Sequence, residues 1–220
     1  MQYVLWVGYG FFWMLLAIDP VSRFTWVLEN ILALVFVVFF LLSYRRINWS
    51  GMTQAAVLCF LALHAIGAHF TYSEVPYDEL GQSVAGFSIN DVFGWERNQY
   101  DRFIHFAYGF LLSIPVLEAI RLASRPAPSL QYRYPAAITV MIVMSTSMIY
   151  ELIEWGAMLV FGSDQGLAFL GAQGDIWDAH KDMFLASCGS LLSVSLLAAS
   201  GYFNSSQIEE ATLHVTGRDR

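Results

Sequence analysis

Histidine, aspartate and glutamate residues interrupt the apolar stretches of this sequence, and several recur at spacings that suit a helix. Asp101 and His105 are four residues apart, and Glu151 and Glu154 are three apart, so each pair would share one helix face. Carboxylates and imidazoles that project from facing helices bind divalent metal ions in helix bundles. The spacing therefore predicts a polar cluster that could hold a metal ion.

The candidate metal ligands share a carboxylate or imidazole group and a position toward one end of an apolar stretch. They are His64, His105, Glu151, Asp178, Asp101, His69, Asp175 and Glu29. Two further carboxylates, Glu154 and Asp182, are candidates for a general base acting on bound water, and Arg102 could hold an anionic head group. The excess of carboxylates over imidazoles favours a hard divalent ion, with Zn, Mn, Fe and Mg all left open.

A second interpretation of the same residues needs no chemistry. The acids could pair with Arg97, Arg102 and Lys181, and such a network would fix helix positions. The sequence has no H-E-x-x-H metal motif, which would have favoured the first interpretation, and no G-x-S-x-G motif, which argues against serine hydrolysis. His64 and His69 are about 140° apart on a helix, so they are not expected to act together.

Composition identifies the class of protein. Of 220 residues, 57% are hydrophobic and only 13% are charged, whereas soluble domains carry roughly 25% charged residues. These values exclude a soluble enzyme, a disordered chain and a disulfide scaffold, and the net charge of −7 argues against a nucleic-acid partner. Six apolar segments lie near the ~17–25 residues that span a bilayer as a helix, so we expect an all-α multi-pass transmembrane bundle. The segments are 3–18, 26–42, 52–70, 103–120, 135–161 and 183–202.

Basic residues between these segments predict the orientation. Seven Lys or Arg residues lie on one side of the predicted bundle and four on the other, so the positive-inside rule places both termini in the cytoplasm. We expect one transmembrane domain, 1–203, with outer loops at about 71–102 and 162–181 and a polar cytoplasmic tail, 204–220. Five of the six segments then carry carboxylates or histidines toward the outer half of the bundle. An ionisable residue at membrane depth is costly, so the cluster is a functional candidate.

Four sequence blocks resemble the YjdF-like family of bacterial inner-membrane proteins and occur in that family's order. They are 64–76 (HAIGAHFTYSEVP), 98–109 (NQYDRFIHFAYG), 150–155 (YELIEW) and 171–183 (GAQGDIWDAHKDM). The D-R-F-x-H-F run, an acidic helix and a late aspartate are also similar to the VanZ-like proteins, which are linked to glycopeptide tolerance. The first resemblance implies a multi-pass fold in the bacterial inner membrane and no established reaction. The second points toward the cell envelope.

These observations lead to three functional hypotheses. The first is metal-dependent chemistry on an envelope lipid or a lipid-linked substrate, at a site open to the periplasm and with membrane lipids as partners. The second is a transporter or proton relay that uses the same side chains, although the apolar inner half of the segments argues against a continuous path. The third is a structural membrane protein with a polar packing network. The sequence does not determine the oligomeric state.

Overall fold

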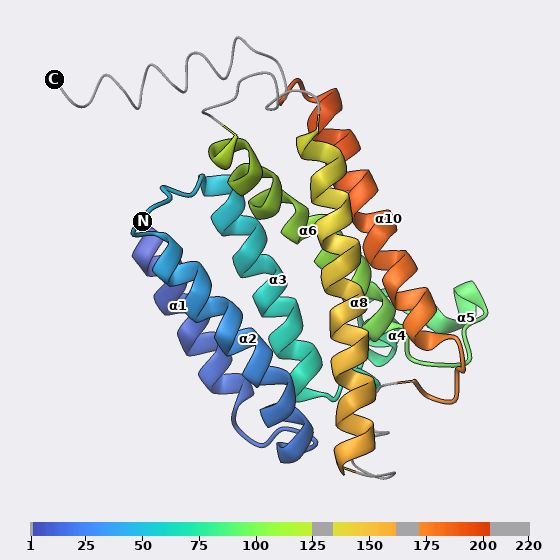
Figure 1. Cartoon of the computed structure of the whole chain (residues 1–220). Coiled ribbons are helices and arrows are strands. Elements are labelled where there is room, and N and C mark those ends of the chain that lie inside the picture. The colour runs from blue at the N-terminus through green and yellow to red at the C-terminus, as the bar shows by residue number, and fades with distance from the viewer. Residues whose placement is uncertain (1, 125–133, 162–171, 203–220) are drawn as a thin grey trace, which may run out of the picture.

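The computed structural model describes residues 2–124, 134–161 and 172–202. Within those ranges every regular element is a helix (Figure 1). In chain order the helices are α1 (Gln2–Leu16), α2 (Arg23–Ser43), α3 (Gly51–His69), α4 (Tyr77–Ala85), α5 (Ile89–Phe93), α6 (Tyr100–Ala123), α8 (Pro135–Phe161) and α10 (Asp178–Ala199). The prediction of an all-α helix bundle is confirmed.

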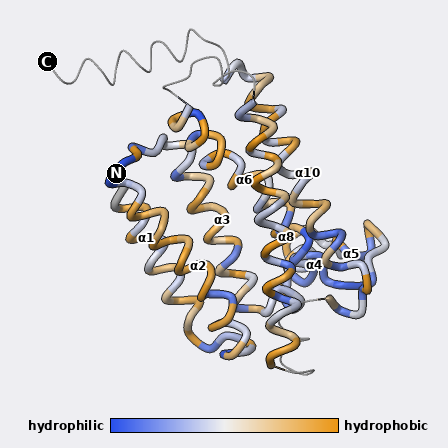
Figure 2. The backbone as a smooth tube through the Cα atoms, in the orientation of Figure 1, coloured by the Kyte–Doolittle hydropathy of each residue, from blue (hydrophilic) through white to orange (hydrophobic). Residues whose placement is uncertain are grey.

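Five of these helices, α2, α3, α6, α8 and α10, are long and apolar enough to cross a membrane. The 15 residues of α1 are apolar, but at 1.5 Å per residue they extend only about 22 Å against a hydrocarbon core of roughly 30 Å. Hydrophobic residues run along the long helices, while hydrophilic ones gather around α4 and the beginning of α10 (Figure 2). The multi-pass architecture is therefore confirmed, whereas the sixth span and the cytoplasmic position of the termini stay predictions.

The predicted outer loop at 71–102 contains two short helices, α4 and α5, and the first turn of α6. Asp78 joins the short helices by accepting hydrogen bonds from Ser88 and from the backbone N–H of Asn90, 2.8 Å away. Residues 162–171 of the predicted loop at 162–181, and the whole predicted tail at 204–220, lie outside the described residues.

Helices α6 and α10 approach each other backbone to backbone, and glycines make this contact. A Cβ atom on Gly109 would lie 1.9 Å from the carbonyl oxygen of Ala186, and one on Gly189 would lie 2.2 Å from that of Phe106. Small residues allow this approach in membrane bundles, where close packing replaces the hydrophobic effect. Ser113 and Ser190 then share a hydrogen bond of 2.7 Å between their hydroxyl oxygens. The contact places the beginning of α6 beside that of α10.

A sharp turn after α3 directs Tyr72 back onto that helix. Thr71 and Tyr72 have φ angles of 52° and 56°, a left-handed conformation that costs a non-glycine residue roughly 1–2 kcal/mol. The ring of Tyr72 lies against Gly67, where a Cβ atom would be only 2.5 Å from the ring. The glycine therefore leaves the space that lets Tyr72 reach His64.

The opposite end of the bundle is held by Glu118 of α6. Its carboxylate accepts hydrogen bonds from the backbone N–H of Ser50 at 2.9 Å, from the Ser50 hydroxyl at 2.7 Å and from the Thr53 hydroxyl. These bonds cap the beginning of α3 with an acid of α6, which is favourable for the helix dipole. A hydrophobic core that includes Trp49 and Leu112 packs on this side.

Candidate functional site

Three buried side chains from two helices form the centre of the candidate site. Asp101 and His105 project from α6 and Asp182 from α10, and one ligand atom from each lies within 4.8 Å of the other two. Opposite ligands around a Mg²⁺ ion are about 4.2 Å apart, because each metal–oxygen bond is about 2.1 Å. Neighbouring ligands of such an ion are about 3.0 Å apart, and at most one pair of these three atoms can be opposite, so the side chains would move inward to bind a cation. The residues present therefore fit a divalent ion.

Glu151 of α8 adds a fourth group to this centre. His105 Nε2 lies 3.7 Å from an oxygen of Asp101 and 3.6 Å from Oε1 of Glu151, so the imidazole stands between two carboxylates. In the part of the chain that the structure describes, Glu151 Oε1 and Asp182 Oδ1 are buried and have no hydrogen-bond partner. A buried polar atom without a partner is costly, and a bound cation would satisfy both oxygens.

We use the term deep cluster for Glu29, Asp101, His105, Glu151, Glu154 and Asp182. Each of them is at most 8% exposed. Among the described residues no Lys or Arg forms an ion pair with any of its five carboxyl groups. Buried carboxylates need a cation, a proton or several hydrogen-bond donors to be stable. The deep cluster therefore lacks a paired cation, although the guanidinium groups of Arg97 and Arg102 lie near enough for their charge to act on Asp101.

A second set of charges, which we call the rim, surrounds the beginning of α10. It contains Arg97, Arg102, Asp175, Asp178 and Lys181. Arg97 lies 2.5 Å from Asp178, Lys181 lies 2.5 Å from Asp175, and Arg102 also pairs with Asp175. The hydrogen bond from Lys181, together with one from the backbone N–H of Trp177, lowers the pKa of Asp175 to about 2. The rim is thus a paired network, the arrangement that the structural interpretation expects for these acids.

Two polar residues that sequence reasoning did not select hold the rim together. The backbone N–H of Asn98 donates to the side-chain oxygen of Gln173, and the amide of Gln173 donates back to the carbonyl of Asn98, both at 3.0 Å. Arg97 also donates to the carbonyl of Ala172 at 3.0 Å. These bonds join the residues before α6 to those before α10. In the sequence, the feature that could have identified Asn98 and Gln173 is their position inside the blocks 98–109 and 171–183.

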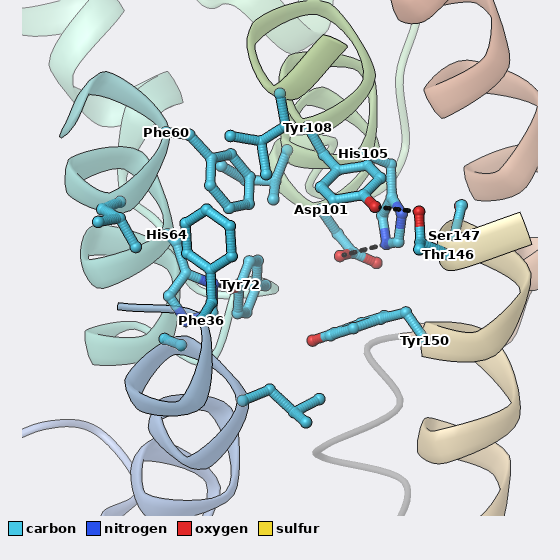
Figure 3. Close-up of a pocket in the computed structure, with 15 residues that line it drawn as sticks. Phe36, Phe60, His64, Tyr72, Asp101, His105, Tyr108, Thr146, Ser147 and Tyr150 are labelled. Carbon is cyan, nitrogen blue, oxygen red and sulfur yellow. Dashed lines mark hydrogen bonds and ion pairs between the residues drawn. The ribbon is translucent and has the colours of Figure 1, made fainter. Parts of the chain in front are cut away.

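His64 and Glu29 lie beside the group formed by Asp101, His105 and Asp182, and each forms a hydrogen bond with a tyrosine. The Tyr72 hydroxyl lies 2.5 Å from Nδ1 of His64, and the Tyr150 hydroxyl donates to Glu29 at 3.0 Å. Sequence reasoning did not select either tyrosine, although both lie within the blocks 64–76 and 150–155. Figure 3 shows Tyr150 reaching toward His64 and Tyr72 across a cavity, with Asp101 and His105 at its edge.

The structure places His69 outside this group. Its Nδ1 lies 2.7 Å from the carbonyl oxygen of Leu16, so its imidazole contacts the end of α1. His64 and His69 therefore bind different partners, as their spacing predicts. His180 packs edge-on against the ring of Trp177.

Cavities approach the site from two sides. One, of about 160 Å³, lies between α2, α3, α6 and α8 and has Asp101 and His105 in its wall. The other, of about 370 Å³, lies along α8 and the beginning of α10, and Glu151, Asp175 and Asp178 line it. Groups of the deep cluster are therefore accessible from both flanks.

Comparisons with known proteins agree with this architecture. Residues 1–202 match the family described as "Predicted membrane protein (DUF2238)". The chain is 32% identical over 178 residues to "Inner membrane protein YjdF" of Escherichia coli (strain K12), covering 80% of this chain and 79% of that protein. No solved structure matches. The chain belongs to the DUF2238 family, and the predicted localisation as a multi-pass inner-membrane protein is confirmed.

Proposed function

We propose that this member of the DUF2238 family is a metal-dependent membrane enzyme that acts on an envelope lipid or a lipid-linked substrate. The observation that carries the proposal is the buried group formed by Asp101, His105 and Asp182. Three ligand atoms from two helices converge there, and one oxygen of Asp182 and one of the neighbouring Glu151 have no hydrogen-bond partner among the described residues. This donor set, rich in oxygen, suits Mg, Mn, Fe or Zn.

The roles of the remaining groups follow from their positions. Asp101, His105 and Asp182 would hold the ion, with Glu151 beside them, and the ion would polarise a phosphoryl or carbonyl oxygen and activate water. Glu154, one helical turn from Glu151 and buried, is the carboxylate left to accept a proton from that water.

The substrate would approach from the bilayer, since both cavities lie among the long apolar helices. Arg102 pairs with Asp175 and lies 3.6 Å from Asp178. An anionic head group would form an ion pair with Arg102, which would keep its contacts with Asp175 and Asp178. In the orientation that the positive-inside rule predicts, this end of the bundle faces the periplasm.

Elemental analysis of the purified protein tests the proposal. Wild-type protein in detergent, dialysed against micromolar Mn²⁺, Zn²⁺ or Fe²⁺, is expected to retain one of these ions, and the Asp182→Asn and His105→Ala variants are expected to lose it. Mutation of a residue that only hydrogen-bonds to a metal ligand typically weakens metal affinity by about 10–100-fold. Removal of a ligand itself should weaken it by at least as much. His180→Ala is the matched control, because His180 lies near the same helix end, is exposed and packs against the Trp177 ring. Wild-type ion content in the folded Asp182→Asn and His105→Ala variants would exclude the metal site.

A proton relay is the second candidate function. The observation that favours it is the set of five buried carboxyl groups without a Lys or Arg partner in the described ranges, because carboxyl groups in that situation can carry protons. The opposite half of the bundle offers little for a relay, since Glu118 is already bound to Ser50 and Thr53. Proteoliposomes that contain a pH-sensitive dye would reveal a relay as proton flux that Glu154→Gln abolishes.

A further inference from the structure

We propose that the cavity between α2, α3, α6 and α8 binds one hydrocarbon chain of a lipid from the leaflet in which α6 begins. The polar end of that lipid would lie at Asp101 and His105. This inference deepens the proposed function, on which it rests, because Asp101 and His105 belong both to the cavity wall and to the metal-binding group.

The cavity changes character along its length. At the end where α6 begins, polar side chains line it, among them Tyr72, Asp101 and Tyr150. Further along the same helices, Phe36, Phe60 and Leu112 line it, together with Tyr108 and Thr146, whose hydroxyl groups hydrogen-bond to each other. Figure 3 shows these two kinds of side chain facing a common space. A lipid has the same order, with polar atoms near the membrane surface and hydrocarbon toward the bilayer centre.

The depth of the cavity matches one leaflet. Asp101 and Leu112 are eleven residues apart on α6, which corresponds to about 16 Å at a rise of 1.5 Å per residue. The hydrocarbon core of a bilayer is roughly 30 Å thick, so one leaflet contributes roughly half of that. The residues that line the cavity therefore span the hydrocarbon depth of one leaflet, and a segment of one chain would lie between Asp101 and Leu112.

The size of the cavity limits the occupant to a narrow group. Its volume is about 160 Å³. An apolar cavity of roughly 150 Å³ in another protein stays dry and holds one benzene ring. The space thus accommodates a segment of one hydrocarbon chain and excludes a whole two-chain lipid.

One polar atom at the outer end is available to such a lipid. His64 is buried at 7% exposure, and its Nδ1 binds the Tyr72 hydroxyl. Its Nε2 forms no hydrogen bond of ordinary geometry within the described part of the chain, although the backbone of Glu29 lies beside the ring. Most buried polar atoms have a partner, so this nitrogen is a reason to expect a ligand. An ester carbonyl or a hydroxyl of a lipid could form that hydrogen bond.

Photolabelling in defined vesicles tests the inference. The protein is reconstituted in phosphatidylethanolamine vesicles that contain a phosphatidylethanolamine with a diazirine midway along one acyl chain, and labelled residues are mapped by mass spectrometry. We expect labels to concentrate on Phe36, Phe60 and Leu112. Ala33→Phe places a ring in the cavity wall and should reduce this labelling about fivefold or more, because a filled cavity rejects the chain.

The matched control is Ala137→Phe, which adds the same ring to an exposed position of α8 and should leave the labelling unchanged. If Ala33→Phe does not fold, the smaller Ala33→Leu change is used in its place. Labelling of Phe36, Phe60 and Leu112 no stronger than that of lipid-facing positions of α8, or unchanged by the Ala33 variants, would overturn the inference. Ion content measured on the same samples separates the two proposals: bound ion without cavity labelling refutes only the chain site, and cavity labelling without ion refutes only the metal site.

Discussion

Replacing Gly109 with alanine should separate α6 from α10 and thereby weaken the deep cluster. The added Cβ atom would lie 1.9 Å from the Ala186 carbonyl oxygen, whereas real Cβ contacts are essentially never shorter than 3.0 Å. Because the clashing atom belongs to the backbone, no side chain can rotate away. The two helices must therefore move apart locally by at least about 1.1 Å.

The expected magnitudes follow from this displacement. Overpacking of a well-packed contact costs typically ~1–3 kcal/mol of stability. The ligand atoms of Asp101, His105 and Asp182 now lie within 4.8 Å of one another, and the movement would lengthen the distances from Asp182 to the two ligands on α6 by up to about 1.1 Å. Opposite ligands of a bound cation need about 4.2 Å, so we expect affinity for Mn²⁺ to fall by about tenfold or more.

Thermal unfolding in detergent and Mn²⁺ titration are the measurements. Gly156→Ala in α8 is the matched control, because a Cβ atom there would have nothing within 4 Å. Alanine favours a helix over glycine, so the control should be neutral or slightly stabilising. If Gly109→Ala unfolds at the same temperature as Gly156→Ala and binds Mn²⁺ equally well, the reasoning about the α6–α10 contact is wrong.

Three other predictions concern charge and orientation. In intact cells, a membrane-impermeant maleimide should label Glu79→Cys and spare Asn48→Cys, because the Lys and Arg majority predicts that Asn48 faces the cytoplasm; the reverse pattern would invert the orientation. Replacing both Glu151 and Glu154 with Gln removes two negative charges, so it should abolish the rise in unfolding temperature that added Mn²⁺ produces and stabilise the ion-free protein; an unchanged rise would show that neither is a ligand. Because the pKa of Asp175 is lowered to about 2, its ion pairs stabilise the fold fully above about pH 4 and lose this effect as pH falls toward 2. The difference in unfolding free energy between Asp175→Asn and wild type should therefore become smaller as the pH falls from about 4 to 2. A difference that stays constant with pH would show that ionised Asp175 does not stabilise the fold.

Apolar run length predicted the long helices well, but it misplaced their polar ends. The predicted segment 135–161 coincides with α8, whereas the predicted segment 183–202 corresponds to α10, which begins at Asp178. A hydropathy boundary stops at the first polar turn. The helix itself continues through it, because Asp178 in the first turn is favourable for the helix dipole and Arg97 pairs with its charge.

The candidate site was predictable only within single helices. A spacing of four residues placed Asp101 beside His105, and their ring-to-carboxylate distance of 3.7 Å agrees with this. Which acid of α10 would join them could not be predicted from spacing, because Asp178 and Asp182 lie on the same stripe of that helix. The choice depends on the register of α6 against α10, which the close contacts at Gly109 and Gly189 set. No local pattern contains that register.

The difference in charge balance between the rim and the deep cluster bears on function. In the rim, three cationic side chains face two acids, Asp175 and Asp178, and every one of these charges has a partner. A purely structural network therefore explains the rim. It does not explain the deep cluster, where five carboxyl groups have two imidazoles nearby, those of His105 and His64, and no Lys or Arg partner within the described ranges. Packing alone would favour apolar residues at such positions, since buried ionic groups seldom stabilise a fold. The carboxyl groups of the deep cluster are thus better explained by a bound cation or by protons that move, and the convergence of Asp101, His105 and Asp182 favours the cation.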